Sequence, residues 1–256
     1  MGHGLDIRVA RRPSCGEVSG PEIAFVVIAA VMGGAAQSVL GFGAAFTTVP
    51  ALAVVAPELL PGAALVSFLP LTTVMAVRER SSSDVPAAIR LSLARIPGIL
   101  VGTVAVRLLD ARGLAVTVAV VMLAAVISVL MGWSVPVTPT SESVAGTVSG
   151  FFGTAVGLGG PPLAVLYRDR PAQQIRPTLA VVFCTGLVLS LVALGVTGSF
   201  TRDQAAVGTG LAVAVMAGLI IASPLLRRLP DRVVRAGLLV WAGGGSIVAL
   251  AQAVFG

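Results

Sequence analysis

Long apolar runs separated by short polar stretches dominate this chain. From Ile23 onward the runs recur at close to the ~20 residues that a helix needs to cross a bilayer. They are continuous rather than alternating, which favours helices over the strands of a membrane barrel. Polar loops divide them at 78–86, 133–142, 167–177 and 227–235. The pattern predicts an all-α polytopic membrane protein with about eight hydrophobic segments.

Two of the apolar segments are interrupted by glycine and proline. Segment 22–56 contains "QSVLGFGAAFTTVP" (37–50), and segment 142–167 contains "TAVGLGGPP" (154–162). Glycine lacks a conformational restraint and proline lacks a backbone donor, so both interrupt helices. Each segment is therefore predicted to form a broken helix or a helical hairpin. Three spans are expected after each, near 62–77, 91–109 and 114–132, and near 177–197, 204–222 and 236–255.

The two interruptions indicate an internal duplication. Gly41-Phe42-Gly43 aligns with Gly157-Leu158-Gly159 at an offset of 116 residues, from 41 to 157. The same offset pairs Pro61 with Pro177 and Gly102 with Gly218. We therefore predict two homologous membrane repeats, residues 22–132 and 142–256. Residues 133–141 form the loop between them, and residues 1–21 form a polar N-terminal tail.

Composition agrees with a membrane protein and restricts its partners. The chain is 56% hydrophobic and 11% charged, and all 17 of its basic residues are arginine. These arginines lie mostly in the short loops, where they set topology, so we expect a lipid bilayer and no nucleic acid as partner. The abundant small residues permit a homodimer without specifying one.

The arginines also test the direction of the repeats. If each broken segment crossed the membrane once, the repeats would be parallel and the arginines would divide evenly between the two sides. If each segment turns back, the repeats are inverted and most arginines share one side: 78, 80, 90, 95, 168, 170, 176, 227, 228, 232 and 235. The positive-inside rule favours the inverted arrangement, with both termini outside. The three arginines of the tail argue against that orientation.

Paired helix breaks at membrane depth are the pattern expected of a transport site. Such breaks persist only where protein or a water-filled cavity covers the freed backbone. A half-helix that starts at a break presents free N–H groups and the positive end of its dipole, which suits an anion. The candidate substrate-binding residues are Gln37, Ser38, Gly41, Gly43, Thr47, Thr48, Thr154, Gly157, Gly159, Gly160 and Pro161. The alternative is that the glycines serve helix packing and the hydroxyls bond their own helices.

Charged residues inside the spans are almost absent. Arg95 lies about one turn inside the span predicted at 91–109, where we expect it to snorkel to the interface, although it could instead face an anion path. No Asp, Glu, His or Lys lies in the middle of any predicted span. The sequence therefore predicts no metal site, no cofactor and no enzymatic base, and it disfavours a proton relay of side chains.

The two interrupted stretches resemble a known family. "GFGAAFTTVPAL" and "GLGGPPLAVLY", each opening a repeat of similar plan, resemble the TauE/SafE sulfite exporter family, also called the toluene sulfonate uptake permease family, over about residues 22–255. The resemblance implies a multi-pass secondary transporter in the plasma (inner) membrane of a prokaryote-type cell. It also maps the family's glycine-rich pattern onto Gly41 and Gly43, followed by two alanines, and onto Gly157, Gly159 and Gly160.

The expected function is that of a permease for a small sulfur-containing anion such as sulfite, thiosulfate or a sulfonate. Transport is expected to follow alternating access around a midplane site between the two glycine-rich breaks. The alternatives are a passive channel for small anions or neutral solutes, and a non-transporting membrane subunit. Saturable flux that can be exchanged against substrate on the other side distinguishes the permease from both.

Overall fold

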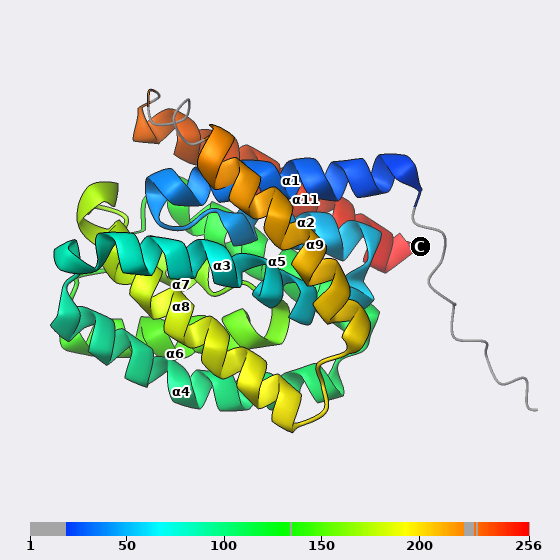
Figure 1. Cartoon of the computed structure of the whole chain (residues 1–256), viewed down its shortest axis with the longest axis horizontal. Helices are drawn as coiled ribbons and strands as arrows, with labels where there is room; N and C mark the ends of the chain where they lie inside the picture. Colours follow the sequence, from blue (N-terminus) through cyan, green and yellow to red (C-terminus); the bar gives the residue numbers. More distant parts are fainter. Residues whose placement is uncertain (1–18, 134, 223–227, 229, 256) are drawn as a thin grey trace, which may run out of the picture.

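A computed structural model shows a bundle of helices (Figure 1). It describes residues 19–133, 135–222, 228 and 230–255, and no strand occurs among them. Most of the predicted polar tail therefore lies outside the described residues. The α-helices are α1 (Gly20–Leu40), α2 (Ala44–Val55), α3 (Gly62–Glu79), α4 (Val85–Leu108), α5 (Ala111–Leu130), α6 (Pro139–Val156), α7 (Gly160–Leu166), α8 (Ala172–Val196), α9 (Arg202–Ala217) and α11 (Asp231–Phe255). Short turns of helix occur at η1 (Pro57–Leu59), η2 (Arg80–Ser82) and η3 (Gly218–Ala222).

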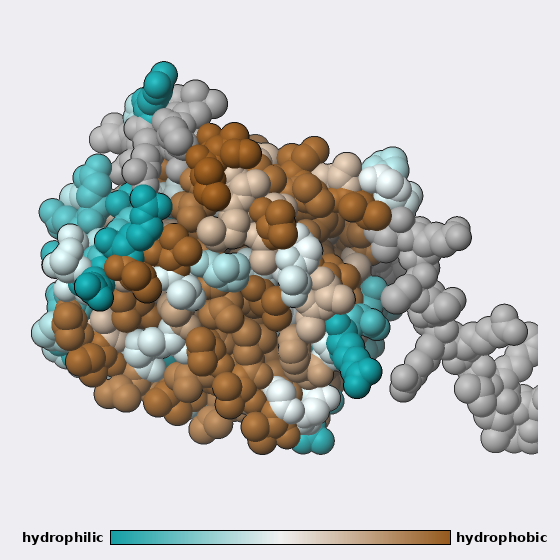
Figure 2. All heavy atoms as spheres, viewed as in Figure 1, coloured by the Kyte–Doolittle hydropathy of each residue, from teal (hydrophilic) through white to brown (hydrophobic). Residues whose placement is uncertain are grey.

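The outward faces of the helices form an apolar surface around the bundle. Six of those in the described part are long and apolar enough to cross a membrane, and α2 and part of α11 add shorter apolar stretches. Large aliphatic side chains face outward along them, among them Leu100, Val192 and Val213. Figure 2 shows this surface as a broad hydrophobic expanse over the body of the bundle. Such a surface is stable only against lipid, so the chain is an integral membrane protein.

The first interrupted segment is a hairpin, because α2 runs back along α1. The Thr47 hydroxyl donates to the Ala29 carbonyl at 2.7 Å. Nearer the turn, a Cβ added to Gly33 would lie 2.9 Å from the Ala44 Cα. Contacts pair later residues of α2 with earlier residues of α1, which is the order of an antiparallel pair. Gly33 allows the two helices to approach this closely.

The second interrupted segment also turns back. Ser149 donates its hydroxyl to the Gly159 carbonyl at 2.5 Å, and Tyr167 donates to the Glu142 carboxylate at 2.7 Å. Residues after the break therefore lie against progressively earlier residues of α6. The returning helix α7 is short, with seven residues. Of the two forms predicted for each segment, both segments take the hairpin.

The two hairpins enter the bundle from opposite ends, as their contacts with α3 show. A Cβ on Gly157, at the tip of the second hairpin, would meet Ala64 in the first turn of α3. Gly41, at the tip of the first, packs against Arg176, whose Nε donates to Glu79 at the end of α3. Helix α3 has 18 residues and spans about 27 Å. Each hairpin tip therefore reaches toward the end of the bundle where the other hairpin enters, and the two tips overlap along the bundle axis.

Packing between the two halves is reciprocal. Helix α4 lies along α6 of the second hairpin, while α9 and η3 lie along α1 of the first. Likewise α3 contacts α9, α8 contacts α4, and α3 contacts α8. Gly102 and Gly218, which the 116-residue offset pairs, both serve these contacts: a Cβ would meet the carbonyl of Phe151 or of Val31. Pro61 and Pro177 differ, since Pro61 precedes α3 whereas Pro177 lies inside α8.

Polar residues gather at one end of the bundle, on the left in Figures 1 and 2. The loops there carry Arg78, Arg80, Arg168 and Arg170. Arg107, Arg112 and Arg202 lie at the other end, where α1 starts and α11 finishes. The arginines named here are thus divided unevenly between the two ends of the bundle.

Candidate functional site

Each hairpin turns at a glycine in the left-handed conformation. Gly41 has φ 82° and ends α1, and Gly157 has φ 81° and ends α6. Their N–H groups donate to the Gln37 and Gly153 carbonyls, at 2.8 and 3.1 Å. Residues with a side chain rarely adopt this conformation, so glycine is what allows each helix to end and turn. The same backbone turn therefore occurs at both predicted breaks.

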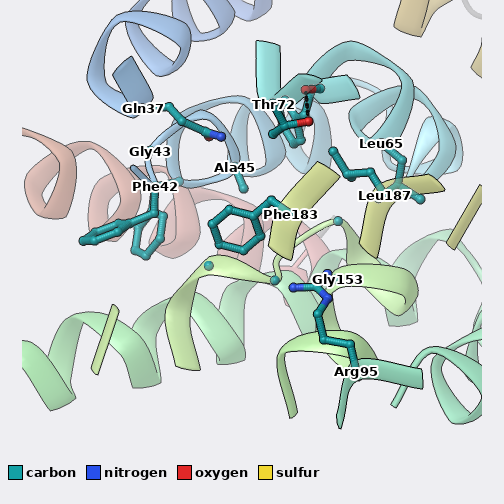
Figure 3. Close-up of a pocket in the computed structure, with 15 residues that line it drawn as sticks. Gln37, Phe42, Gly43, Ala45, Leu65, Thr72, Arg95, Gly153, Phe183 and Leu187 are labelled. Carbon is teal, nitrogen blue, oxygen red and sulfur yellow. Dashed lines mark hydrogen bonds between the residues drawn. The ribbon is translucent and has the colours of Figure 1, made fainter. Parts of the chain in front are cut away.

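A cavity of about 40 Å³ lies where the two turns face each other (Figure 3). One water needs roughly 10–15 Å³ of such volume, so the cavity has room for a few waters or a small ion. Gln37 and Gly43 reach it from the first hairpin, and Gly157 and Gly159 from the second. The other lining residues come from both hairpins and from α3, α4 and α8: Phe42, Ala45, Phe46, Leu65, Phe68, Thr72, Arg95, Gly153, Gly160, Phe183 and Leu187.

Arg95 supplies the positive charge of this cavity. It is 2% exposed, so the expectation that it snorkels to the interface is wrong. Helix α4 begins at Val85 rather than near 91, which places Arg95 about 15 Å along the helix, too deep for its side chain to reach the interface. Asp84, which caps the helix by accepting from the Ala87 N–H, and Pro86 in the first turn are the sequence signals for this earlier start.

The guanidinium is held by a hydroxyl and an aromatic ring. Its Nη1 donates to the Ser149 Oγ at 2.7 Å, and its Cζ lies 5.6 Å from the Phe183 ring centroid. Gly186 of α8 leaves room for it, since a Cβ there would lie 2.6 Å from the Cζ. Among the described residues Arg95 makes no ion pair, and its Nε has no hydrogen-bond partner. The site therefore presents an uncompensated cation with a free donor.

Gln37 approaches the cavity from the side opposite Arg95, as Figure 3 shows. Its Oε1 accepts from the Ala44 N–H at 3.1 Å, at the start of α2. That bond uses the oxygen of the amide and leaves its NH₂ group as a donor. The cavity thus has donors on two sides, a guanidinium and an amide, and none of its lining residues is acidic.

Comparison with protein families places this chain in a known family. The family model for the sulfite exporter TauE/SafE matches residues 26–249, nearly the whole chain. The chain belongs to the TauE/SafE sulfite exporter family. No curated protein and no solved structure matches it. TauE/SafE is a family of membrane transporters of sulfur-containing anions rather than of enzymes, and both helix breaks lie inside the matched region.

The predicted site residues of this TauE/SafE protein divide into two groups. Gln37, Gly43, Gly157, Gly159 and Gly160 line the cavity. The others lie around it. Gly41 forms the first turn, Ser38 donates to the Ala35 carbonyl, and Thr47 joins α2 to α1. Thr154 bonds to Ser190, Pro161 lies in the first turn of α7, and Thr48 is buried with no hydrogen-bond partner among the described residues. The hydroxyls of Thr47 and Thr154 join neighbouring helices, whereas that of Ser38 bonds its own helix.

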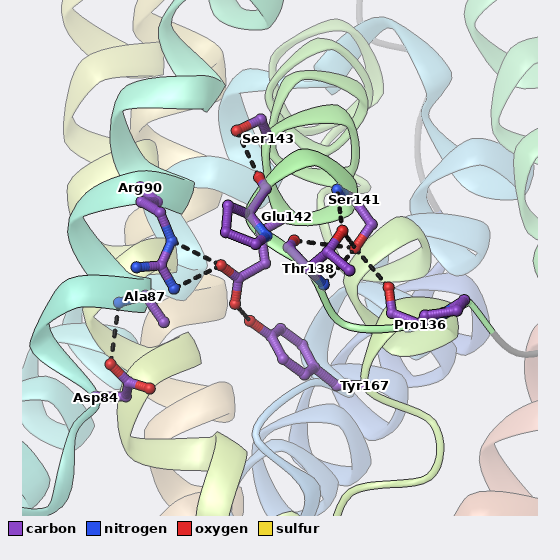
Figure 4. Close-up of polar contacts among 10 residues, drawn as sticks. Asp84, Ala87, Arg90, Pro136, Thr138, Ser141, Glu142, Ser143 and Tyr167 are labelled. Atoms are coloured by element: carbon purple, nitrogen blue, oxygen red, sulfur yellow. Dashed lines mark hydrogen bonds and ion pairs between the residues drawn. The ribbon is translucent and has the colours of Figure 1, made fainter.

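A second polar cluster anchors the hydrophilic end of the second hairpin (Figure 4). The Glu142 carboxylate accepts from Arg90 Nε at 2.8 Å and from the Tyr167 hydroxyl at 2.7 Å. These bonds join α4, the start of α6 and the end of α7. Burial, together with the bond to Glu142, raises the pKa of Tyr167, so its hydroxyl stays protonated and donates. Within the described residues no group of acidic, histidine or cysteine side chains could hold a metal ion.

Proposed function

We propose that this TauE/SafE protein is a secondary transporter for a small sulfur-containing anion such as sulfite, thiosulfate or a sulfonate. The observation that carries the proposal is Arg95, which is buried between two helix breaks and has no counter-charge within the part of the chain that the structure describes. The two hairpin turns, Arg95 and Gln37 form the substrate site, and the substrate passes by alternating access around it.

The electrostatics of the cavity favour an anion as ligand. A buried charge without a partner is costly, by about 3 kcal/mol even on membrane-insertion scales. A bound anion offsets that cost through the free Nε of Arg95 and the amide of Gln37. A cation or neutral solute would leave the guanidinium uncompensated.

The size and walls of the cavity favour a small substrate. A volume of about 40 Å³ suits an ion of a few heavy atoms. Phe42, Phe46, Phe68 and Phe183 make most of its walls apolar. Among the family's substrates, sulfite fits this conformation best, whereas an aryl sulfonate requires the cavity to widen.

The burial of Arg95 favours a carrier over a passive channel. An ion cannot reach a residue that is 2% exposed unless the surrounding helices move. Hairpins inserted from opposite ends are suited to this movement, since shifting either one opens the cavity toward a different side. Their arrangement and the reciprocal packing support a pair of inverted repeats. The arginine-rich end then faces the cytoplasm of a cell whose plasma membrane holds the protein.

The test is sulfite flux into proteoliposomes, comparing the wild type with Arg95→Gln. Removing the partner of a buried charge costs about 2–5 kcal/mol, so saturable flux should fall at least ~30-fold. Arg107→Gln is the matched control, because Arg107 is an exposed arginine on the same helix and its loss should leave flux unchanged. Saturable flux at the wild-type rate in Arg95→Gln would contradict the proposed site. Flux that never saturates would identify a channel.

A further inference from the structure

A wide apolar groove runs along the outside of the second hairpin, apart from the substrate cavity. It has a volume of about 750 Å³ and lies between α5, α6 and α7. Val120 and Ala124 form its wall on α5, and Val144 and Val148 its wall on α6. Pro161 of α7 closes its inner side. The groove therefore lies against the short helix that follows the second break.

On the proposed duplication, α1, α2 and α11 correspond to α6, α7 and α5, and in the first half the protein itself fills the corresponding place. There Phe25 of α1 stacks on Trp241 of α11, with ring centroids 5.6 Å apart, and the Trp241 Nε1 donates to the Thr47 carbonyl. Through this aromatic pair α11 packs against the first hairpin. It occupies the position where the second half has the groove.

The residues that match this pair are small. Phe25 precedes Gly41 by 16 residues, and Ser141 precedes Gly157 by the same number. The stretch "LLDARGL" (108–114) resembles "RLPDRVV" (228–234), which pairs Asp110 with Asp231. Val120 and Trp241 each follow their aspartate by ten residues. Ser141 and Val120 both line the groove. The groove thus arises where two aromatic rings are replaced by a hydroxyl and an isopropyl group.

One end of the groove is polar and lies beside a cation. Ser128, Thr138 and Ser141 line that end. The Ser128 carbonyl accepts from the Trp133 N–H at 3.1 Å, and the Trp133 carbonyl in turn accepts from Arg168 Nη1 at 3.4 Å. The loop Arg168-Asp169-Arg170 keeps one net positive charge at this end of the bundle. The groove is therefore apolar along its length, with hydroxyl groups and positive charge at its mouth.

We propose that this groove binds an anionic phospholipid of the surrounding bilayer. Its acyl chain takes the place that Phe25 and Trp241 fill in the other half, and its phosphate lies near Arg168 and the hydroxyls of the polar end. Through Pro161 and Val165 the lipid supports α7, and so the turn that carries Gly159. The matching with Phe25 and Trp241 rests on the proposed duplication, whereas the layout of the groove does not.

The test is the lipid retained by the purified protein in native mass spectrometry, after reconstitution in phosphatidylglycerol. The variant Val120→Trp/Val144→Phe fills the groove with rings while keeping Ser141, which caps α6. Val213→Trp/Val240→Phe is the matched control, because both valines face outward on α9 and α11, 71% and 77% exposed. The wild type and the control should each retain one tightly bound phosphatidylglycerol, and the groove variant at least tenfold less.

Two results would overturn the proposal. Equal retention in the groove variant and the control would place the lipid elsewhere. A wild-type dimer that the groove variant abolishes would make a second copy of the chain the occupant. Retention is measured without substrate, so its outcome is independent of the proposed transport function. Phosphatidylcholine in place of phosphatidylglycerol should be retained less. Equal retention of the two lipids would show that Arg168 does not contribute to lipid binding.

Discussion

Arg95 is held in the interior by packing and a hydroxyl rather than by a carboxylate. Ser149 accepts from its Nη1 and donates to the Gly159 carbonyl, so one serine joins the cation to the second hairpin turn. Movement of that hairpin therefore changes the position of the charge. Such a coupling between the proposed binding residue and a helix break is what a carrier requires.

Gly159 offers a direct test at the residue scale. A Cβ there would lie 3.3 Å from the Arg95 guanidinium nitrogens and 3.2 Å from the Ser149 carbonyl, so Gly159→Leu should fill the cavity. We expect sulfite flux to fall below a tenth of the wild-type rate in protein that still inserts. Gly210→Leu is the control, because no atom outside its own helix lies within 4 Å of a Cβ at that exposed position. Normal flux in Gly159→Leu would show that the turn at Gly159 is not part of the substrate site.

The sequence predicted the turns better than the charge between them. Gly41 and Gly157 are recognisable because each lies in an interrupted segment, at positions that one constant offset relates. Arg95 was misjudged because snorkelling depends on depth, and depth depends on where α4 begins. The hydroxyls of Thr47 and Thr154 show a second limit, since composition does not tell whether a hydroxyl faces a cavity or a neighbouring helix.

At the scale of elements, each hairpin packs against helices from the other half of the chain. Helix α4 packs on α6, and α9 with η3 packs on α1, through glycines that bring backbones into contact. All eight predicted segments appear as helices in the structure because apolar length alone specifies them. Their partners follow from tertiary packing, which the sequence pattern does not contain.

A substitution at Gly218 tests the packing of η3 against α1. A Cβ there would strike the Val31 carbonyl, so Gly218→Leu should force η3 away from α1. Overpacking costs about 1–3 kcal/mol or more, so the melting temperature in detergent should fall by several degrees. Gly237→Leu, at an exposed position of α11 without neighbours within 4 Å, should melt like the wild type. An unchanged melting temperature for Gly218→Leu would mean that this contact does not stabilise the fold.

For the whole molecule, the distribution of charge predicts which end faces the cytoplasm. The end with Arg78, Arg80, Arg168 and Arg170 carries the larger number of described loop arginines, which the positive-inside rule assigns to the cytoplasm. We therefore propose that α1 starts, and α11 ends, on the outer side. The described helices fix only the relative positions of these ends, and the direction follows from electrostatics.

Labelling of single cysteines with a membrane-impermeant maleimide in intact cells tests this orientation. In a chain with Cys15 and Cys184 replaced by serine, Thr197→Cys should be labelled from outside. Ser82→Cys, exposed at the arginine-rich end, should react only after the cells are opened. The reverse pattern would show that the tail arginines, rather than the loop arginines, determine the orientation.

The most direct test of the central claim is a structure of the protein with selenite, a sulfite analogue whose selenium is located by anomalous scattering. The account predicts the anion in the cavity, bonded to the Nε of Arg95 and within reach of Gln37 and the turn at Gly159. The peak should be absent in Arg95→Gln. Selenite bound elsewhere in the bundle, with Arg95 not in contact, would contradict an anion site between the two helix breaks.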